Sequence, residues 1–219
     1  MYYGRKFSVL SVFSKSKKGT LKTAKGNKWD DHYALRARKE QWLARSVYKL
    51  EEIDQKHKLI RPGDGILDLG CYPGSWSQYC LKKVGPGGNV VGVDLKEPDR
   101  FSAPNFKFIQ ADILTLDLEA LVHEIGPRDG VLSDLAPRTS GIGVTDAARS
   151  LRLAEGALRI ALGALKKGGN FLCKVFEGED LPSFRKEVLQ RFSQGRTVRP
   201  AAVRKASREV YILGLSLMK

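Results

Sequence analysis

Residues 65–76 read GILDLGCYPGSW, a short apolar run followed by two glycines, a proline and an indole. The run GILDLG has the length and composition of a buried strand, and the glycines after it mark a tight turn. In an open parallel sheet, ligands bind beyond the carboxyl ends of the strands, where a glycine lets the backbone approach them closely. Gly70 and Gly74 are therefore predicted to shape a ligand-binding turn, with Trp76 beside it.

The sequence around this turn alternates short apolar runs with helical patterns. The other predicted strands are residues 89–95, 106–112, 130–136, 170–176, 208–218 and, more weakly, 195–203. Helices are predicted at 75–84, roughly 117–125, 146–166 (with Thr145 as the N-cap) and 181–192. Strands rich in Val, Ile and Leu without polar alternation are typical of a sheet covered on both faces. The pattern predicts an α/β fold, a doubly wound, mostly parallel seven-stranded sheet.

The net charge of +14 is concentrated at the two ends of the chain. Residues 1–58 carry 15 Lys and Arg against 6 acids, residues 59–180 carry 14 against 16, and residues 181–219 carry 9 against 2. Basic ends flanking a nearly neutral middle favour a polyanionic partner, most simply nucleic acid. A solvated basic surface that only keeps the protein soluble is the alternative.

The first 28 residues hold eight basic side chains and no acid. We interpret residues 1–28 as a basic flexible arm, and residues 29–219 as one domain that opens with a basic helical extension, two helices or a kinked one broken near Ser46. An organelle transit peptide is the alternative for the arm, although it holds one Arg among many Lys. The sequence shows no membrane span, and we expect a cytoplasmic monomer.

Three scattered cysteines and three separate histidines predict neither a disulfide framework nor a metal site.

Two acids at predicted strand ends indicate the kind of cofactor. The turn has the spacing GxxxG, so it lacks both the dinucleotide fingerprint GxGxxG and a P-loop. Asp94, 20 residues after Gly74, can accept hydrogen bonds from ribose hydroxyls, and Asp112 can accept one from an adenine amino group. A nucleoside without phosphate fits this pattern, and S-adenosylmethionine (SAM) is the candidate. A glycine-rich turn by itself is common in α/β folds.

Two further strand ends carry charges where a sheet is usually apolar. Asp134 lies in SDLAP, and Lys174 lies within the apolar run NFLCKVF. Burying a lysine there is costly unless it is paired or functional. Glu209 and Lys49, taken singly, have the pattern of surface charges.

Several motifs resemble one known family in order and spacing. They are RSVYKL, DLGCYPGSWSQ, SDLAP followed by Ser140-Gly141, CKVFEGE and SREVY. From about Trp29 to the C-terminus the chain resembles the FtsJ/RrmJ (RlmE-type) ribose 2′-O-methyltransferases. The resemblance implies a Rossmann-like SAM-dependent methyltransferase fold and a catalytic tetrad. Its members would be Lys49, Asp134, Lys174 and Glu209, and SAM contacts are implied at Gly74, Trp76, Asp94 and Asp112.

The resemblance also implies a reaction and a substrate. Lys174 would be the base that takes the proton of a ribose 2′-hydroxyl, with Asp134 orienting its amine and favouring the positive methyl centre of the cofactor. The implied substrate is a uridine in the A-loop of large-subunit ribosomal RNA. Transfer RNA, a non-catalytic RNA-binding assembly factor and a nicotinamide enzyme are the alternatives. The sequence departs from the family at Tyr72, where Ala is usual, and at Arg138-Thr139, where Asn-Met is familiar.

Overall fold

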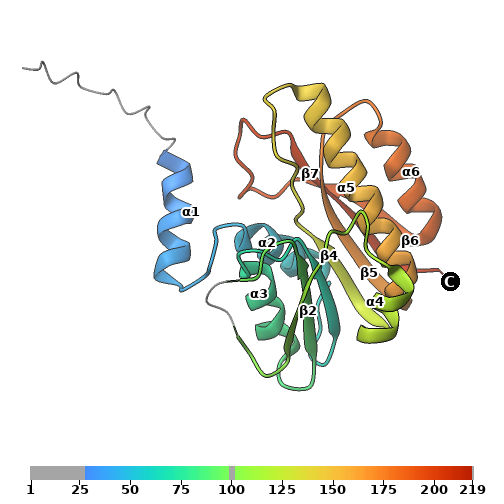
Figure 1. Ribbon diagram of the computed structural model, residues 1–219. Coiled ribbons are helices and arrows are strands. Elements are labelled where there is room, and N and C mark those ends of the chain that lie inside the picture. The colour runs from blue at the N-terminus through green and yellow to red at the C-terminus, as the bar shows by residue number, and fades with distance from the viewer. Residues whose placement is uncertain (1–27, 99–101, 219) are drawn as a thin grey trace, which may run out of the picture.

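The computed structural model describes residues 28–98 and 102–218, which form one seven-stranded sheet flanked by helices (Figure 1). The strands are β1 (Gly65–Leu69), β2 (Asn89–Asp94), β3 (Phe106–Gln110), β4 (Arg128–Ser133), β5 (Leu165–Phe176), β6 (Phe192–Val198) and β7 (Glu209–Leu217). The helices are α1 (Lys28–Lys39), α2 (Val47–His57), α3 (Ser75–Val84), α4 (Leu118–Ile125), α5 (Gly143–Ala164) and α6 (Leu181–Arg191). The predicted doubly wound α/β fold is confirmed.

The order of the strands creates a binding edge at the centre of the sheet. The order is β3-β2-β1-β4-β5-β7-β6, and β7 runs in the direction opposite to all the other strands of this sheet. From β1 the chain winds outward through β2 and β3, and it then returns to the other side of β1 with β4. The switch point therefore lies between the carboxyl ends of β1 and β4, where an open α/β sheet binds its ligands.

Two apolar clusters, one on each face, hold the helices against the sheet. One cluster joins α4, α5 and α6 to residues such as Leu67 and Val131, and the other joins α2 and α3 to residues such as Ile66 and Leu132. Alternate residues of a strand point to opposite faces, so β1 supplies both clusters and all five of its residues are buried. Burial on both faces explains why this strand reads as an apolar run.

The turn after β1 depends on glycine at Gly70. Its φ is +78°, and a Cβ added there would lie 2.8 Å from Cδ2 of Leu135. A side chain at this position would meet both backbone strain and a steric clash, so the loop after β1 approaches the loop after β4 only because residue 70 lacks a Cβ. The turn then leads through a cis Tyr72–Pro73 peptide bond into α3.

Several predicted boundaries are wrong, and three of them have a clear physical reason. Helix α5 begins at Gly143, before the predicted cap Thr145; Asp146 lies in its first turn and accepts hydrogen bonds from the backbone N–H groups of Ser140 and Gly141. Strand β5 begins at Leu165, five residues early, because it pairs there with Arg128. The strand predicted over 195–203 spans 192–198 instead, and Pro200, which has no N–H to donate to a ladder, follows it.

The predicted basic arm, residues 1–28, lies outside the described residues except for Lys28, where α1 begins. No helix in the described part of the chain has the length and apolar character needed to cross a membrane.

Candidate active site

A cavity of about 320 Å³ opens beyond the carboxyl ends of β1, β2 and β4, at the switch point of the sheet. Four of the residues predicted to hold the cofactor line it: Gly70, Asp94, Asp112 and Asp134. Tyr72 completes the polar part of the lining, and Ile113, Leu135 and Leu153 contribute apolar surface. The strand order thus brings together four residues that are up to 64 positions apart in the sequence.

Asp94 and Asp112, the two carboxylates predicted to bind the cofactor, are held in place by backbone N–H groups. Asp94 Oδ2 accepts a hydrogen bond from the Tyr72 N–H at 3.0 Å, and Asp94 Oδ1 accepts one from the Lys96 N–H, also at 3.0 Å. Asp112 Oδ1 accepts one from the Leu114 N–H at 2.9 Å. A carboxylate oxygen has two lone pairs, so each group keeps acceptor capacity toward the cavity. This pair of acceptors fits the hydroxyls and the amino group of an adenosine, which donate, and its negative charge disfavours a phosphate-bearing dinucleotide.

Gly74 and Trp76 do not appear among the residues that line this cavity. Gly74, with φ of 114°, precedes the first residue of α3. The indole of Trp76 is buried, and its Nε1–H donates to the carbonyl oxygen of Ser46 at 3.0 Å, which fastens α3 to the loop before α2. Contact of these two residues with the cofactor therefore stays a prediction.

The four residues of the implied tetrad meet as two ion pairs. Lys174 Nζ lies 3.1 Å from Asp134 Oδ1, and it also donates to the Asp134 carbonyl oxygen at 2.5 Å. Lys49 Nζ, from α2, lies 2.6 Å from Glu209 Oε1, at the start of β7. Lys49 and Glu209, which look like surface charges in the sequence, are mostly buried, with side chains 14% and 11% exposed.

Tyr211, which the sequence analysis did not identify, joins the two pairs. Its hydroxyl lies 2.8 Å from Asp134 Oδ1 and 2.9 Å from Glu209 Oε1. A tyrosine hydroxyl has one proton, so the two carboxylates share a single donor. The sequence feature that could have identified Tyr211 is its position in SREVYIL, two residues after Glu209 and hence on the same face of the strand.

The charges of the site fix the protonation of its acids. Burial would raise the pKa of Asp134, but the positive charges of Lys174 and Lys49 and the Tyr211 hydroxyl outweigh it and hold that pKa below its usual value. Burial and the neighbouring carboxylates Asp134 and Glu209 raise the pKa of Tyr211 well above its usual value. Asp134 is therefore an ionised acceptor at neutral pH, and Tyr211 keeps its proton and remains a donor.

Asp68, in DLG at the end of β1, is a second residue that the sequence analysis missed. Its Oδ2 accepts a hydrogen bond from the Ser77 hydroxyl at 2.6 Å, while its Oδ1 is buried without a partner among the described residues. Burial raises the pKa of Asp68 to about 7. The feature that could have identified Asp68 is a charged residue inside an apolar run, the same feature that identified Lys174.

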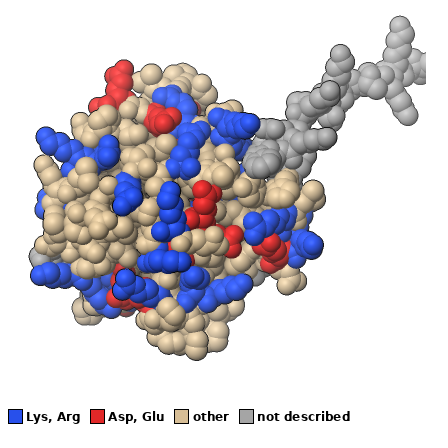
Figure 2. All heavy atoms as spheres, turned by 180° about the vertical axis from the view of Figure 1, so that it is seen from behind, with Lys and Arg blue, Asp and Glu red and all other residues tan. Residues whose placement is uncertain are grey.

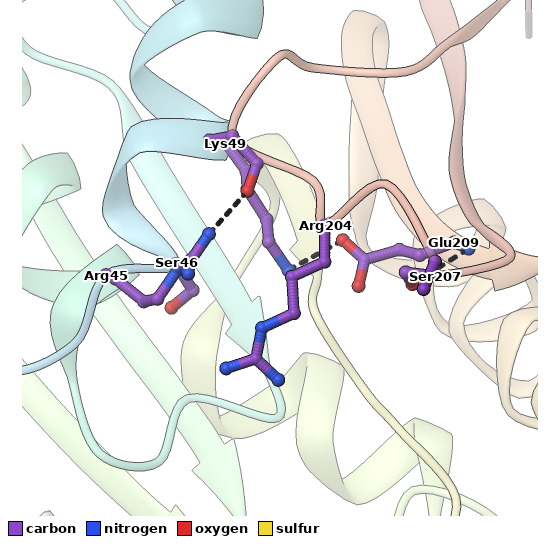
Figure 3. A pocket seen from close by; sticks show the side chains of 8 residues that line it. Arg45, Ser46, Lys49, Arg204, Ser207 and Glu209 are labelled. Atoms are coloured by element: carbon purple, nitrogen blue, oxygen red, sulfur yellow. Dashed lines mark hydrogen bonds and ion pairs between the residues drawn. The ribbon is translucent and has the colours of Figure 1, made fainter. Parts of the chain in front are cut away.

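A second cavity, of about 470 Å³, opens on the other side of the tetrad (Figure 3). Lys49 reaches from α2 to Glu209 across this cavity, and the side chain of Arg204 lies beside the pair. Arg45, Ser46 and Ser207 complete its polar lining. Asp134 lines the first cavity and Lys49 and Glu209 line the second, so the tetrad connects a cofactor cavity to a basic one. Lys and Arg also outnumber acids on the molecular face seen in Figure 2.

The fold and the site together define a SAM-dependent methyltransferase, with a cofactor cavity at the switch point and a charged tetrad beside it. The family model of FtsJ-like methyltransferases matches residues 42–217, which is most of the chain. The chain belongs to the FtsJ-like methyltransferase family, and its cofactor is S-adenosylmethionine.

Relatives and solved structures agree with this assignment. The chain is 48% identical over 192 residues to a protein of Desulfosudis oleivorans named ribosomal RNA large subunit methyltransferase E, covering 88% of this chain and 93% of that protein. It is 49% identical to the protein of that name from Bdellovibrio bacteriovorus, covering 85% and 96%. A crystal structure titled as a ribosomal RNA methyltransferase of Plasmodium falciparum aligns with a TM-score of 0.70 at 25% identity, over 81% of this chain and 99% of that one. Fibrillarin of Aeropyrum pernix, solved with bound SAM, shares the fold, with a TM-score of 0.50 at 18% identity over 72% of this chain and 68% of that one.

Proposed function

We propose that this protein transfers the methyl group of SAM to a ribose 2′-hydroxyl of large-subunit ribosomal RNA, at a uridine of the A-loop. The observation that carries the proposal is the Lys174–Asp134 pair, 3.1 Å apart. Asp134 lines the cavity at the switch point, and Tyr211 links it to Glu209 in the lining of the basic cavity. The names of the bacterial relatives support the choice of RNA. RNA supplies a 2′-hydroxyl and DNA does not.

When bound, SAM supplies an electrophilic methyl group on a sulfonium. The protein's part is to prepare the hydroxyl that receives it. Lys174 Nζ, in its uncharged form, accepts the proton of the 2′-hydroxyl as the oxygen attacks. Asp134 orients this amine through two contacts, and its ionised carboxylate stabilises positive charge at the cofactor's methyl centre.

The second ion pair is placed to position the substrate. Lys49 and Glu209 line the basic cavity, where they can hold the ribose of the target nucleotide while Arg45 and Arg204 attract its phosphates. Alignment of the hydroxyl with the methyl group then supplies much of the rate. Because one chain contributes all four tetrad residues, the proposal includes action as a monomer, in the cytoplasm, where ribosomal subunits are assembled.

Labelled SAM and large ribosomal subunits lacking the modification test the proposal. We expect label in the large-subunit RNA, at one alkali-resistant linkage in the A-loop, and label that accumulates at least about a hundredfold more slowly with Lys174→Ala. Label in transfer RNA instead would show that the proposed substrate is wrong. Absence of transfer to any RNA, while calorimetry shows SAM binding, would show that the proposed activity is wrong.

A further inference from the structure

The basic cavity is the first of two cavities along the same face of α2. A further cavity, of about 190 Å³, is lined by Glu52, Ile53, Lys56 and His57 of this helix. The basic cavity is lined by Arg45 and Ser46, just before this helix, and by Lys49 in its first turn. Residues three or four positions apart lie on one side of a helix, so these side chains form one continuous stripe.

The opposite wall of both cavities is also one stretch of chain. Residues 197–200 line the further cavity, and residues between Ala202 and Glu209 line the basic one. Two hydrogen bonds join the walls: Arg45 Nη2 donates to the Ala202 carbonyl at 2.9 Å, and the Ala201 N–H donates to Glu52 Oε2 at 2.8 Å. We define the α2 groove as the two cavities between α2 and residues 197–209.

The walls of the α2 groove are held firmly. Arg199 donates to the carbonyl oxygens of Ser207 and Glu209, which folds the segment between β6 and β7 back on itself. With the two contacts to α2, these bonds fix the segment at its start and at its end. The groove is therefore largely preformed, and a ligand need not order it.

Positive charge continues along the α2 groove away from the tetrad. Lys56 and Arg199 line the further cavity and are exposed. Arg196, also exposed, lies two residues before Val198 of that lining and hence on the same face of β6. Its charge also lowers the pKa of His57, after burial as the main cause. Glu52 is the acid in the lining of that cavity, and its carboxylate is already bonded to the Ala201 N–H. Such a surface suits a row of phosphates.

We infer that the RNA backbone on one side of the methylated nucleotide runs along the α2 groove, with its phosphates passing from Arg204 to Lys56 and Arg196. This inference rests on the proposed function. Helix α2 has 11 residues and is about 16 Å long at 1.5 Å per residue, which is enough for several phosphates. The groove thus extends the contact beyond the target nucleotide and gives the bound strand a direction.

The test compares two double variants that remove the same charge. Lys56→Gln with Arg196→Gln alters the far end of the α2 groove, and Lys167→Gln with Lys186→Gln is the control, on exposed residues outside the lining of both cavities. Binding of A-loop RNA is measured against salt concentration, and methyl transfer is measured at saturating SAM. We expect the groove variant to bind about fivefold to twentyfold more weakly, with a salt slope smaller by about 1.4 for two lost phosphate contacts to a single strand. Its kcat should be unchanged, and the control should match the wild type.

Shortened RNAs then test the direction of the strand. Removing the nucleotides on one side of the target should abolish the difference between the groove variant and the wild type, whereas removing the other side should preserve it. A groove variant that binds like the control, or that loses kcat with KM unchanged, would overturn the inference. If the wild type methylates no RNA but the salt slopes of the two variants still differ, the proposed function is wrong, whereas RNA binding along the α2 groove is supported.

Discussion

The two ends of strands β4 and β5 carry the same chemical pair in different settings. At the amino end, Lys166 Nζ lies 2.8 Å from Asp129 Oδ1, and the two side chains are 47% and 29% exposed. At the carboxyl end, Lys174 Nζ lies 3.1 Å from Asp134 Oδ1, and the side chains are 6% and 16% exposed. A lysine–aspartate distance alone therefore does not distinguish a surface pair from the pair that we propose to be catalytic.

The neighbours of each pair make the difference. Asp129 also accepts a hydrogen bond from the Gly65 N–H at 2.8 Å, so this pair ties the start of β1 to β4 and β5 at the surface. Asp134 instead lines the cavity at the switch point, and through Tyr211 it is linked to Glu209, which lines the basic cavity. Burying two charges is costly, and a site keeps them where their chemistry is needed.

The largest expected effect separates the two lysines. Lys174→Ala should lower the single-turnover rate of methyl transfer about 10²- to 10⁴-fold at saturating SAM and RNA, because the proposed general base is removed. Lys166→Ala, the matched control, should leave that rate within about twofold and lower the stability by at most about 1 kcal/mol, as is usual for an exposed ion pair. Similar rates for the two variants would remove the catalytic assignment of Lys174.

The next effect distinguishes Asp94, which we expect to bind SAM, from Asp129, which we expect to have no contact with it. Asp94→Asn should weaken SAM binding about tenfold to a hundredfold, because a hydrogen bond to a charged group contributes about 1.5–3 kcal/mol. Isothermal calorimetry measures this, with Asp129→Asn as the control that keeps wild-type affinity. A wild-type dissociation constant for Asp94→Asn would contradict the placement of the cofactor's ribose.

A third experiment uses the opposite pKa shifts of two aspartates, Asp68 and Asp129. The pKa of Asp68 is raised by burial from 3.8 to about 7, so the folded state should lose stability as the pH rises through that range. Asp68→Asn should remove this decline, a difference on the order of 1–4 kcal/mol in the free energy of unfolding between pH 4 and pH 8. Denaturant unfolding at several pH values measures it.

Asp129 provides the comparison for that experiment. Burial would raise its pKa, but the hydrogen bonds from Lys166 and Gly65 outweigh burial and lower it. Its stabilising contribution should therefore be present above about pH 4, the ordinary value for an aspartate, and be lost as the pH falls below that. If both asparagine variants changed the pH profile in the same direction, the assigned environments would be wrong.

The smallest expected effect belongs to Tyr211→Phe. In this variant Asp134 keeps its ion pair with Lys174, Glu209 keeps its ion pair with Lys49, and the aromatic ring remains in the core. The rate of methyl transfer should therefore fall by less than about tenfold, the equivalent of one modest hydrogen bond. Single-turnover kinetics and thermal unfolding together measure it. A loss as large as that of Lys174→Ala would mean that the shared hydroxyl is essential to the arrangement of the tetrad.

Local features of the sequence determined the elements and most of the chemistry-bearing residues. Gly70 marked the turn because glycine adopts a positive φ without strain, and Lys174 was noticeable because a charge inside an apolar strand is costly. The ordered motifs imply the tetrad through the resemblance to the family. These signals are readable because each depends on a few neighbouring residues.

Only the tertiary structure decided which side chains meet. Trp76 fastens α3 to the loop before α2, Tyr211 joins two carboxylates 75 residues apart in the sequence, and α2 faces residues 197–209 across a groove. The same holds for Lys166 and Lys174, which lie eight positions apart on one strand. Their different environments come from the order of the strands and from the segments that cover each end of β5. The residues adjacent to a lysine in the sequence encode neither the strand order nor these segments.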